Sequence, residues 1–344
     1  IFGAVFESTL NPETRRSGGM HYTSIENIHK VIDPLFLDEL KAELDEICAN
    51  PVERTRTAKL RVFQRKLASL TFLDPACGSG NFLTETYLSL RRLENKILVE
   101  LSHGQVTMYS ASESPIQVSI SQFYGIEIND EIARVAKMNM IVHDDGHTNV
   151  ISFDALDSID KMHDHNRGFE AGKFDLILTN PPFGSTITKA EKPYLANYEL
   201  GKTKDAKGKY KDRPRQSSEI LFIERIWEFL KPGTGKAAIV LPDGVLTNSS
   251  AQYVRDFILE KFQLLAVVSL PQCAFAHFGA GVKTSIIFVR KRKADEKPDE
   301  NEAIFMAAPA LIGYDATGRK TDSQLDEIIQ KYEEFQKDAT PFFA

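Results

Sequence analysis

The sequence predicts an α/β protein built on a doubly wound, mostly parallel sheet. From Leu70 onward, short apolar runs alternate with longer segments whose apolar residues recur at helical spacing. Glycine, proline or acidic residues follow several of the apolar runs, as expected where strands end and ligand-binding loops begin. The 344 residues and the hydrophobic content of 42% are sufficient for a large buried core.

Residues 1–69 are predicted to form a helical segment that precedes the sheet. Ser24 is a candidate N-cap for a first helix, and we expect Pro34 to end that helix, because proline cannot continue it. Leu37 to Ala49 and Thr57 to Leu70 show further amphipathic patterns at helical spacing. The sequence therefore predicts three helices before the first strand.

Residues 70–292 contain the alternating pattern and are predicted to form the core domain. The predicted strands are 70–73, 122–128, 150–153, 173–178, 237–241, 264–270 and 284–289, and the predicted helices are 81–98, 131–143, 217–230 and 252–262. No helical pattern separates the last two strands, so we expect one of them to lie antiparallel. Residues 185–216 are predicted to be a long polar loop, and residues 293–344 a charged linker and a C-terminal helix.

The composition argues against several classes of protein. No apolar run approaches membrane-spanning length and no signal peptide opens the sequence, so we expect a cytoplasmic protein without a membrane partner. The three widely spaced cysteines form neither a zinc pattern nor a disulfide framework. His143, His147, His163 and His165 have no third cluster of ligands nearby in the sequence, so we expect no metal site.

The run from Phe174 to Gly184 joins a buried strand to a rigid polar corner. Pro181 and Pro182 fix two backbone angles and remove two donors, so we expect the neighbouring carbonyls to stay free. Asn180 is held out of the helical region by the proline that follows it, at a strand end where α/β sheets bind ligands. With Phe183 as a stacking face, these acceptors suit a planar group carrying an amine, such as a flipped adenine. The alternative is a strand that simply ends in a proline turn.

A glycine loop and three acids follow the earlier strands. Gly78 and Gly80 lie where the first strand turns into a helix, and they allow the backbone to pass close to a ligand. Glu127 ends the second strand, where one carboxylate can bind two ribose hydroxyls. Asp74 and Asp154 end the first and third strands. Each acid alone is equally a solvated strand end, but three in order before the proline corner argue against coincidence.

These motifs resemble those of the N6-adenine DNA methyltransferases of restriction–modification systems. The likeness is greatest to type I modification subunits and to the methylase part of fused type IIG enzymes, and it covers roughly residues 19–292. The two most specific motifs are residues 73–82 and 180–183, in this order and spacing. The resemblance implies a class I S-adenosylmethionine-dependent methyltransferase fold, Rossmann-like, with a mostly parallel sheet of seven strands. It also implies methyl transfer from S-adenosylmethionine to a flipped adenine in double-stranded DNA.

The resemblance further implies which residues form the site. Asn180, Pro181, Pro182 and Phe183 match the catalytic motif that binds the adenine. The segment from His21 to Ser24 is similar to one that closes over the methionine end of the cofactor. Asp154 matches the residue that meets the cofactor's own adenine. The implied cofactor-binding residues are Tyr22, Thr23, Asp74, Ala76, Gly78, Gly80, Asn81, Phe82, Glu127, Ile128, Asp154, Ala155 and Asn180.

A basic segment follows the proline corner. Residues 201–215 contain seven lysines or arginines and two aspartates, in a chain whose net charge is −6. Glycine and proline within this segment disfavour a helix, so we expect a loop that is mobile without DNA. We interpret four of its basic residues as DNA phosphate contacts, with a solvated loop as the alternative: Lys207, Lys209, Lys211 and Arg213.

The acidic balance of the whole chain is unfavourable for gripping DNA unaided. We therefore expect a specificity subunit or a C-terminal target-recognition domain, toward which residues 293–344 would lead. Three alternatives stay open. The chain is the methylase portion of a bifunctional endonuclease–methyltransferase, a methyltransferase that acts on RNA or on protein glutamine, or a non-catalytic DNA-binding subunit with the same fold.

Overall fold

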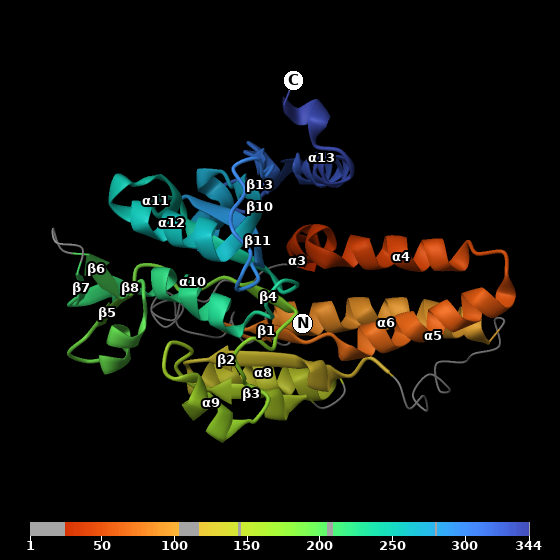
Figure 1. Ribbon diagram of the computed structural model, residues 1–344, viewed down its shortest axis with the longest axis horizontal. Coiled ribbons are helices and arrows are strands. Elements are labelled where there is room, and N and C mark those ends of the chain that lie inside the picture. The colour runs from red at the N-terminus through yellow and green to blue at the C-terminus, as the bar shows by residue number, and fades with distance from the viewer. Residues whose placement is uncertain (1–24, 103–116, 144–145, 205–208, 279–280, 344) are drawn as a thin grey trace.

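The structure is a computed structural model that describes residues 25–102, 117–143, 146–204, 209–278 and 281–343. Its centre is a sheet of eight strands in the order β12-β10-β11-β9-β4-β1-β2-β3 (Figure 1). The strands are β1 (Phe72–Asp74), β2 (Phe123–Glu127), β3 (Val150–Ser152), β4 (Leu176–Thr179), β9 (Lys236–Pro242), β10 (Phe262–Ser269), β11 (Thr284–Lys291) and β12 (Phe305–Ala307). Helices cover both faces of this sheet, so the predicted doubly wound α/β class is confirmed.

The direction of the strands brings the predicted ligand loops to one edge of the sheet. Strands β3, β2, β1, β4 and β9 are parallel neighbours. Their carboxyl ends therefore lie at the same edge, which is where open α/β sheets bind ligands. β11 runs antiparallel between β9 and β10, which confirms the antiparallel strand predicted from the missing helix.

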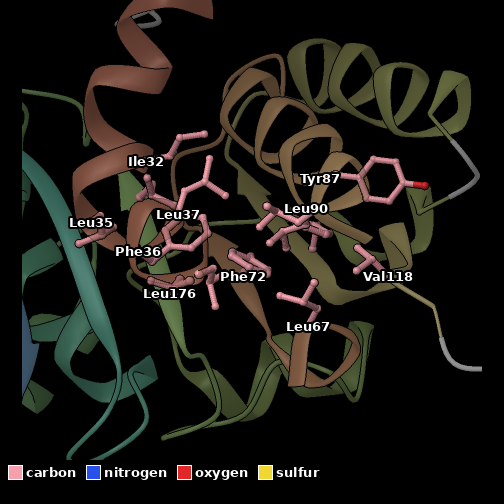
Figure 2. Close-up of a cluster of buried hydrophobic side chains, with 14 of the residues drawn as sticks. Ile32, Leu35, Phe36, Leu37, Leu67, Phe72, Tyr87, Leu90, Val118 and Leu176 are labelled. Carbon is pink, nitrogen blue, oxygen red and sulfur yellow. The ribbon is translucent and has the colours of Figure 1, made fainter. Parts of the chain in front are cut away.

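Two apolar clusters sandwich the sheet. On β4, the side chains of Leu176 and Leu178 belong to one cluster and that of Ile177 to the other, which is why this strand reads as a continuous apolar run. The first cluster packs under α3 (Ile25–Ile32), α4 (Asp38–Cys48), α5 (Glu53–Ser69), α6 (Asn81–Leu101) and α8 (Asp130–Val142). Figure 2 shows part of this cluster, in which Phe36 and Leu67 approach Phe72 of β1.

The opposite face is covered mainly by helices from the second half of the chain. These are α9 (Ile159–His165), α10 (Ser218–Phe229), α11 (Asp243–Thr247) and α12 (Gln252–Lys261). The sequence did not predict α9, which is short and polar. Its first turn is capped by Ser158, whose hydroxyl accepts a hydrogen bond from the Asp160 amide at 3.2 Å.

Pro34 does not end the first helix, contrary to our expectation. The chain continues through one π-helical turn, η1 (Asp33–Leu37), directly into α4. The wider turn places Pro34 near its start, where the missing amide donor is tolerated, and the Asp38 amide bonds back to the Asp33 carbonyl. Burial of Leu35, Phe36 and Leu37 favours this continuous path over a break.

The segment predicted as a long polar loop is folded. β5 (Thr186–Thr188) pairs with β8 (Arg215–Ser217), and β6 (Lys202–Lys204) pairs with β7 (Tyr210–Asp212), both antiparallel. We call residues 186–217 the insert, and Figure 1 shows it projecting from the end of the molecule opposite α4 and α5. Its strands are polar on both sides and too short for an alternating apolar pattern, so the sequence carried no strand signal.

The C-terminal residues are more than a linker and a helix. β12 pairs in parallel with β10 and adds an eighth strand to the seven that were predicted. A hairpin of β13 (Ile312–Tyr314) and β14 (Lys320–Ser323) follows, and α13 (Leu325–Lys337) packs near α3 and η1. Buried Phe305 and Tyr332 join this region to the first apolar cluster, so the sheet extends beyond residue 292. None of the helices in the described ranges is long and apolar enough to cross a membrane.

Candidate active site

β1 brings Asp74 to the sheet edge, where the chain turns into α6. The Asp74 carboxylate accepts a hydrogen bond from the Ala76 amide at 3.0 Å, which closes the turn. Gly78 and Gly80 have φ angles of +52° and +81°, conformations that favour glycine. No atom of the described residues lies within 4 Å of a Cβ atom built on Gly78, whereas one on Gly80 would lie 3.4 Å from the side chain of Ala136 in α8. Among the described residues, Gly78 therefore faces open space, and Gly80 is needed for its backbone angle and its packing against α8.

Glu127 ties the glycine loop to the turn after β2. Its two carboxylate oxygens accept hydrogen bonds from the backbone amides of Gly78 at 3.1 Å and Asn129 at 2.9 Å. Burial raises the pKa of Glu127. Burial also raises the pKa of Asp74, which is 2% exposed, to about 7, and the nearby Glu127 carboxylate adds to that shift. Two acids thus share one buried region and keep acceptor positions for hydroxyl or amine donors.

The other predicted cofactor residues lie beside these acids in the chain. The Asn81 amide donates to the Ser79 hydroxyl at 2.9 Å at the start of α6. Ile128, directly after Glu127, is 67% exposed, so an apolar side chain lies open to a planar ring. Ala155 is buried behind Asp154 in the second apolar cluster.

Asp154, after β3, is held by two side chains from the insert. Its Oδ2 atom accepts hydrogen bonds from Lys192 Nζ at 2.9 Å and Tyr194 Oη at 2.8 Å. Its Oδ1 atom accepts one from the Leu156 amide at 3.0 Å. Burial and the Asp154 carboxylate raise the pKa of Tyr194, so this phenol stays protonated and donates. Lys192 and Tyr194 were not predicted from the sequence, because both lie in a polar stretch with no local signal.

The corner after β4 presents an unpaired acceptor. The Asn180 side-chain oxygen is buried and accepts no hydrogen bond from the residues that the structure describes. Buried polar atoms are rarely left unpaired, so this oxygen is suited to a donor from a ligand. The carbonyl of Pro182, which we expected to be free, accepts a hydrogen bond from Ser218 Oγ at 3.0 Å. The prediction that the carbonyls beside both prolines stay free was therefore wrong for Pro182.

The start of α10 holds this corner in place. Ser218 is 2% exposed, and its amide also donates to the Ser185 carbonyl at 2.9 Å. The Glu219 carboxylate accepts a hydrogen bond from the Gly184 amide at 3.4 Å, and Gly184 has a φ of +76°. Both side chains come from the first turn of a helix that the sequence located, but the pattern there indicated only a helix start.

An apolar cavity adjoins the corner. Phe82 and Asn180 line it together with Val240, Ile286 and other apolar residues of β9, β10 and β11. Asn27 and Lys30 of α3 also line it. Two of the predicted site residues, Phe82 and Asn180, thus border one cavity.

The basic residues of the insert differ in their surroundings. Lys209 and Lys211 are exposed. Arg213 is partly buried: its guanidinium lies 4.3 Å from the centre of the Tyr253 ring, and its Nε donates to the Lys202 carbonyl at 3.0 Å. Lys209 and Lys211 therefore lie at the surface of the insert, whereas Arg213 has a clear structural role.

Some of the predicted positions cannot be located. Tyr22, Thr23 and the rest of the His21–Ser24 segment lie outside the described residues, as does Lys207. Within the described ranges, no three histidine, cysteine, aspartate or glutamate side chains come together as metal ligands.

Comparison with known proteins gives a consistent result. Residues 59–344 match the family model described as N-6 DNA Methylase. The chain is 42% identical over 142 residues to DNA methyltransferase A of Bacillus subtilis, covering 41% of this chain and 15% of that protein. It is 27% identical over 229 residues to the type I restriction enzyme EcoEI methylase subunit of Escherichia coli, covering 64% of this chain and 38% of that subunit.

Solved structures show the same fold. The type IIL restriction-modification enzyme MmeI, solved in complex with DNA, matches with a TM-score of 0.67 and 27% identity over 89% of this chain and 41% of that one. A Listeria monocytogenes structure ascribed to the class I S-adenosylmethionine-dependent methyltransferases matches with a TM-score of 0.50 and 18% identity, covering 96% of this chain and 83% of that one. The chain spans well under half the length of the two curated relatives described above.

Proposed function

The chain belongs to the N-6 DNA methylase family, and we propose that it transfers a methyl group from S-adenosylmethionine to the N6 amine of an adenine in double-stranded DNA. It does so as the modification component of a restriction–modification system. The observation that carries this proposal is the Asn180 side-chain oxygen, which is buried and unpaired among the described residues. It lies at the same edge of the sheet as the glycine loop and the acids at the strand ends. An exocyclic amine is a donor that would satisfy this oxygen.

The residues at the sheet edge fit S-adenosylmethionine. The open space at Gly78 lets the backbone approach a ligand, and the buried carboxylate of Glu127 keeps acceptor positions for ribose hydroxyls. Asp154 has an oxygen for the adenine amine, and exposed Ile128 offers an apolar face to the ring. When bound, S-adenosylmethionine supplies a methyl group made electrophilic by its sulfonium.

The corner after β4 orients the target base. Asn180 Oδ1 and the Pro181 carbonyl accept the two hydrogens of the adenine amine, which draws the nitrogen lone pair out of conjugation with the ring. Phe183 stacks on the base and holds the amine in line. Ser218 and Glu219 fix the turn through Pro182 and Gly184, so orientation supplies much of the rate enhancement.

DNA and a recognition module are the proposed partners. Lys209 and Lys211 are exposed on the insert, which begins three residues after Phe183 and returns at Ser217. The net charge of −6 leaves the rest of the chain unfavourable for phosphate binding. We infer that a specificity subunit or a target-recognition domain supplies the remaining affinity and the choice of sequence. The methylase subunits of type I restriction enzymes among the relatives support this inference. We propose a cytoplasmic location for the chain.

A second candidate function has the same chemistry but joins the chain to an endonuclease. The MmeI structure has the higher TM-score of the two described above, and the type II restriction enzyme and methyltransferase RM.BcgI of Heyndrickxia coagulans is 26% identical over 234 residues. These matches favour the methylase portion of a bifunctional endonuclease–methyltransferase. The chemistry at Asn180 is the same in both cases.

The test is methyl transfer from radiolabelled S-adenosylmethionine to mixed bacterial DNA, by the chain alone and with candidate recognition modules added. We expect label in N6-methyladenine. Label in RNA or in glutamine but not in DNA would replace the proposed substrate. Cofactor binding without transfer to any nucleic acid or protein in all combinations would support a non-catalytic subunit instead.

A further inference from the structure

The insert touches both halves of the proposed active site. It leaves the catalytic corner at Thr186 and returns at Ser217, and β5 and β8 pair where it does so. At this end, the Ser218 amide bonds to the Ser185 carbonyl at 2.9 Å. Further along, Lys192 and Tyr194 reach Asp154 after β3. One folded unit therefore contacts the corner proposed to hold the target base and the acid proposed to hold the cofactor.

A buried set of contacts anchors residues 198–200 of the insert. Tyr198 is 2% exposed, and its hydroxyl donates to the Leu156 carbonyl at 2.7 Å. Arg225 of α10 donates to the Asp157 carbonyl at 2.8 Å and to the Tyr198 hydroxyl at 3.0 Å. The buried Glu224 carboxylate accepts the Leu200 amide at 2.8 Å. These side chains are buried and hydrogen-bonded, so they hold residues 198–200 against α10 and the turn after β3.

The contacts to Asp154 are more accessible. The Lys192 side chain is 43% exposed and that of Asp154 is 18% exposed, in contrast to the buried anchor four residues beyond Tyr194. A carboxylate offers about four acceptor positions. Lys192 and Tyr194 occupy Oδ2, and the Leu156 amide occupies one position on Oδ1. Among the described residues, no donor fills the remaining position on Oδ1, and the two insert side chains set its direction.

We propose that Lys192 and Tyr194 are positioning residues that aim Asp154 at the cofactor and thereby couple cofactor binding to the placement of the basic insert on DNA. When Lys192 and Tyr194 bind Asp154, they hold its Oδ1 atom in position for the cofactor's adenine amine. When the cofactor is bound, it holds Asp154 in the position in which that residue binds Lys192 and Tyr194. Because the same insert presents Lys209 and Lys211, cofactor and DNA favour one arrangement of it. Coupling of this kind is reciprocal, so each ligand tightens the other by the same factor.

This inference rests on the proposed function, and one set of binding measurements separates the two. The affinity of the full chain for S-adenosylhomocysteine is measured by calorimetry at low ionic strength, with and without a saturating mixed-sequence duplex. In the parent we expect the duplex to tighten cofactor binding by about 5-fold or more. In the double variant Lys192→Gln, Tyr194→Phe we expect weaker cofactor binding and almost no tightening by the duplex. The duplex affinity, measured with and without S-adenosylhomocysteine, should show the same factors.

The matched control is Lys189→Gln. Lys189 is on the same insert and its side chain is 46% exposed, but it pairs with Asp212 within the insert and not with Asp154. It loses the same charge, so it should keep the parent's coupling. The single variant Lys192→Arg keeps a charged donor at this position and should retain most of the coupling. Circular dichroism melting checks that each variant is folded.

The outcomes are distinct. A parent that fails to bind S-adenosylhomocysteine under either condition would refute the proposed function itself. A parent that binds it equally with and without the duplex would overturn the coupling and leave the proposed function standing. Equal tightening in the parent and the double variant would show that Lys192 and Tyr194 have no part in it. Equal loss in the Lys189 and Lys192 variants would assign the effect to general charge.

Discussion

At the scale of single residues, the buried Asn180 oxygen makes the sharpest prediction. Asn180→Ala removes the acceptor for the target amine but none of the contacts at Asp74, Glu127 or Asp154. We expect methyl transfer to fall by about 100-fold or more, since orientation of the amine is lost. Calorimetry should find cofactor affinity nearly unchanged. Transfer at the parental rate would refute the assignment of Asn180.

Glu127 is predicted to bind cofactor hydroxyls, and the structure adds that it also holds the Gly78 and Asn129 amides. Glu127→Ala should weaken S-adenosylmethionine binding by roughly 1.5–3 kcal/mol, the range for hydrogen bonds to a charged group. Glu127→Gln retains one acceptor oxygen and should lose less. Titration calorimetry on both variants decides the point, and unchanged affinity in a folded Glu127→Ala protein would remove this residue from the site.

Asp74 predicts a pH dependence of stability. Its pKa in the folded protein is about 7, against the usual 3.8 of an aspartate, because it is buried. The folded state therefore binds the Asp74 proton more tightly than the unfolded state, so this residue's contribution to stability falls as pH rises from about 4 to about 7. Asp74→Asn mimics the protonated form. In urea unfolding without cofactor, it should exceed the parent in stability at pH 7 to 8, and the difference should shrink toward pH 4. A difference that is constant with pH would contradict this account.

At the scale of elements, the first turn of α10 supports the catalytic corner. Ser218→Ala removes the hydrogen bond to the Pro182 carbonyl and leaves the corner less well positioned. We expect kcat to fall by about 10-fold or more while cofactor affinity holds, since small displacements of reacting groups are costly. Ser217→Ala is the matched control, because Ser217 is the N-cap of the same helix and makes no side-chain capping bond. An equal fall of kcat in both variants would show that a general change at the start of α10, and not the hydrogen bond to Pro182, causes the loss.

The insert makes a prediction about salt. Replacing Lys209 and Lys211 with Gln should flatten the salt dependence of DNA binding by up to about two units of slope, near one for each lost phosphate contact. Cofactor affinity without DNA should not change. Lys293→Gln with Lys297→Gln is the control: both are exposed, and they follow the end of β11 at the opposite edge of the sheet. The slopes can be read from fluorescence anisotropy titrations, and identical slopes in the two double variants would contradict the assignment.

At the scale of the whole molecule, the distribution of charge predicts that catalysis and sequence recognition depend on different modules. The insert carries an excess of basic residues, while the chain as a whole has a net charge of −6. We expect the 344 residues alone to bind duplex DNA weakly and with little preference between a target site and a scrambled one. Adding a specificity subunit or a target-recognition domain should restore both affinity and preference in a competition assay. Tight, sequence-specific binding by the chain alone would contradict this division.

The sequence by itself determined the fold class and the chain positions of the proposed site. Apolar periodicity and turn residues are local properties, so they located the strands β1 to β4 and β9 to β11 and the loops at Asp74, Glu127, Asp154 and Asn180. Local patterns missed the strands of the insert, which are polar and held by pairing, and the π-helical turn through Pro34, which burial of its neighbours maintains.

Only the tertiary structure decided which side chains meet. Lys192 and Tyr194 lie about forty residues from Asp154 in the chain, and Ser218 lies a similar distance from Pro182. It also decided that Gly80 faces α8 while Gly78 faces open space, although both are glycines of one loop. Such contacts depend on how distant elements pack, and no spacing within a short stretch of sequence encodes them. The proposed reacting groups can therefore be predicted from the sequence, whereas only the fold determines which groups position them.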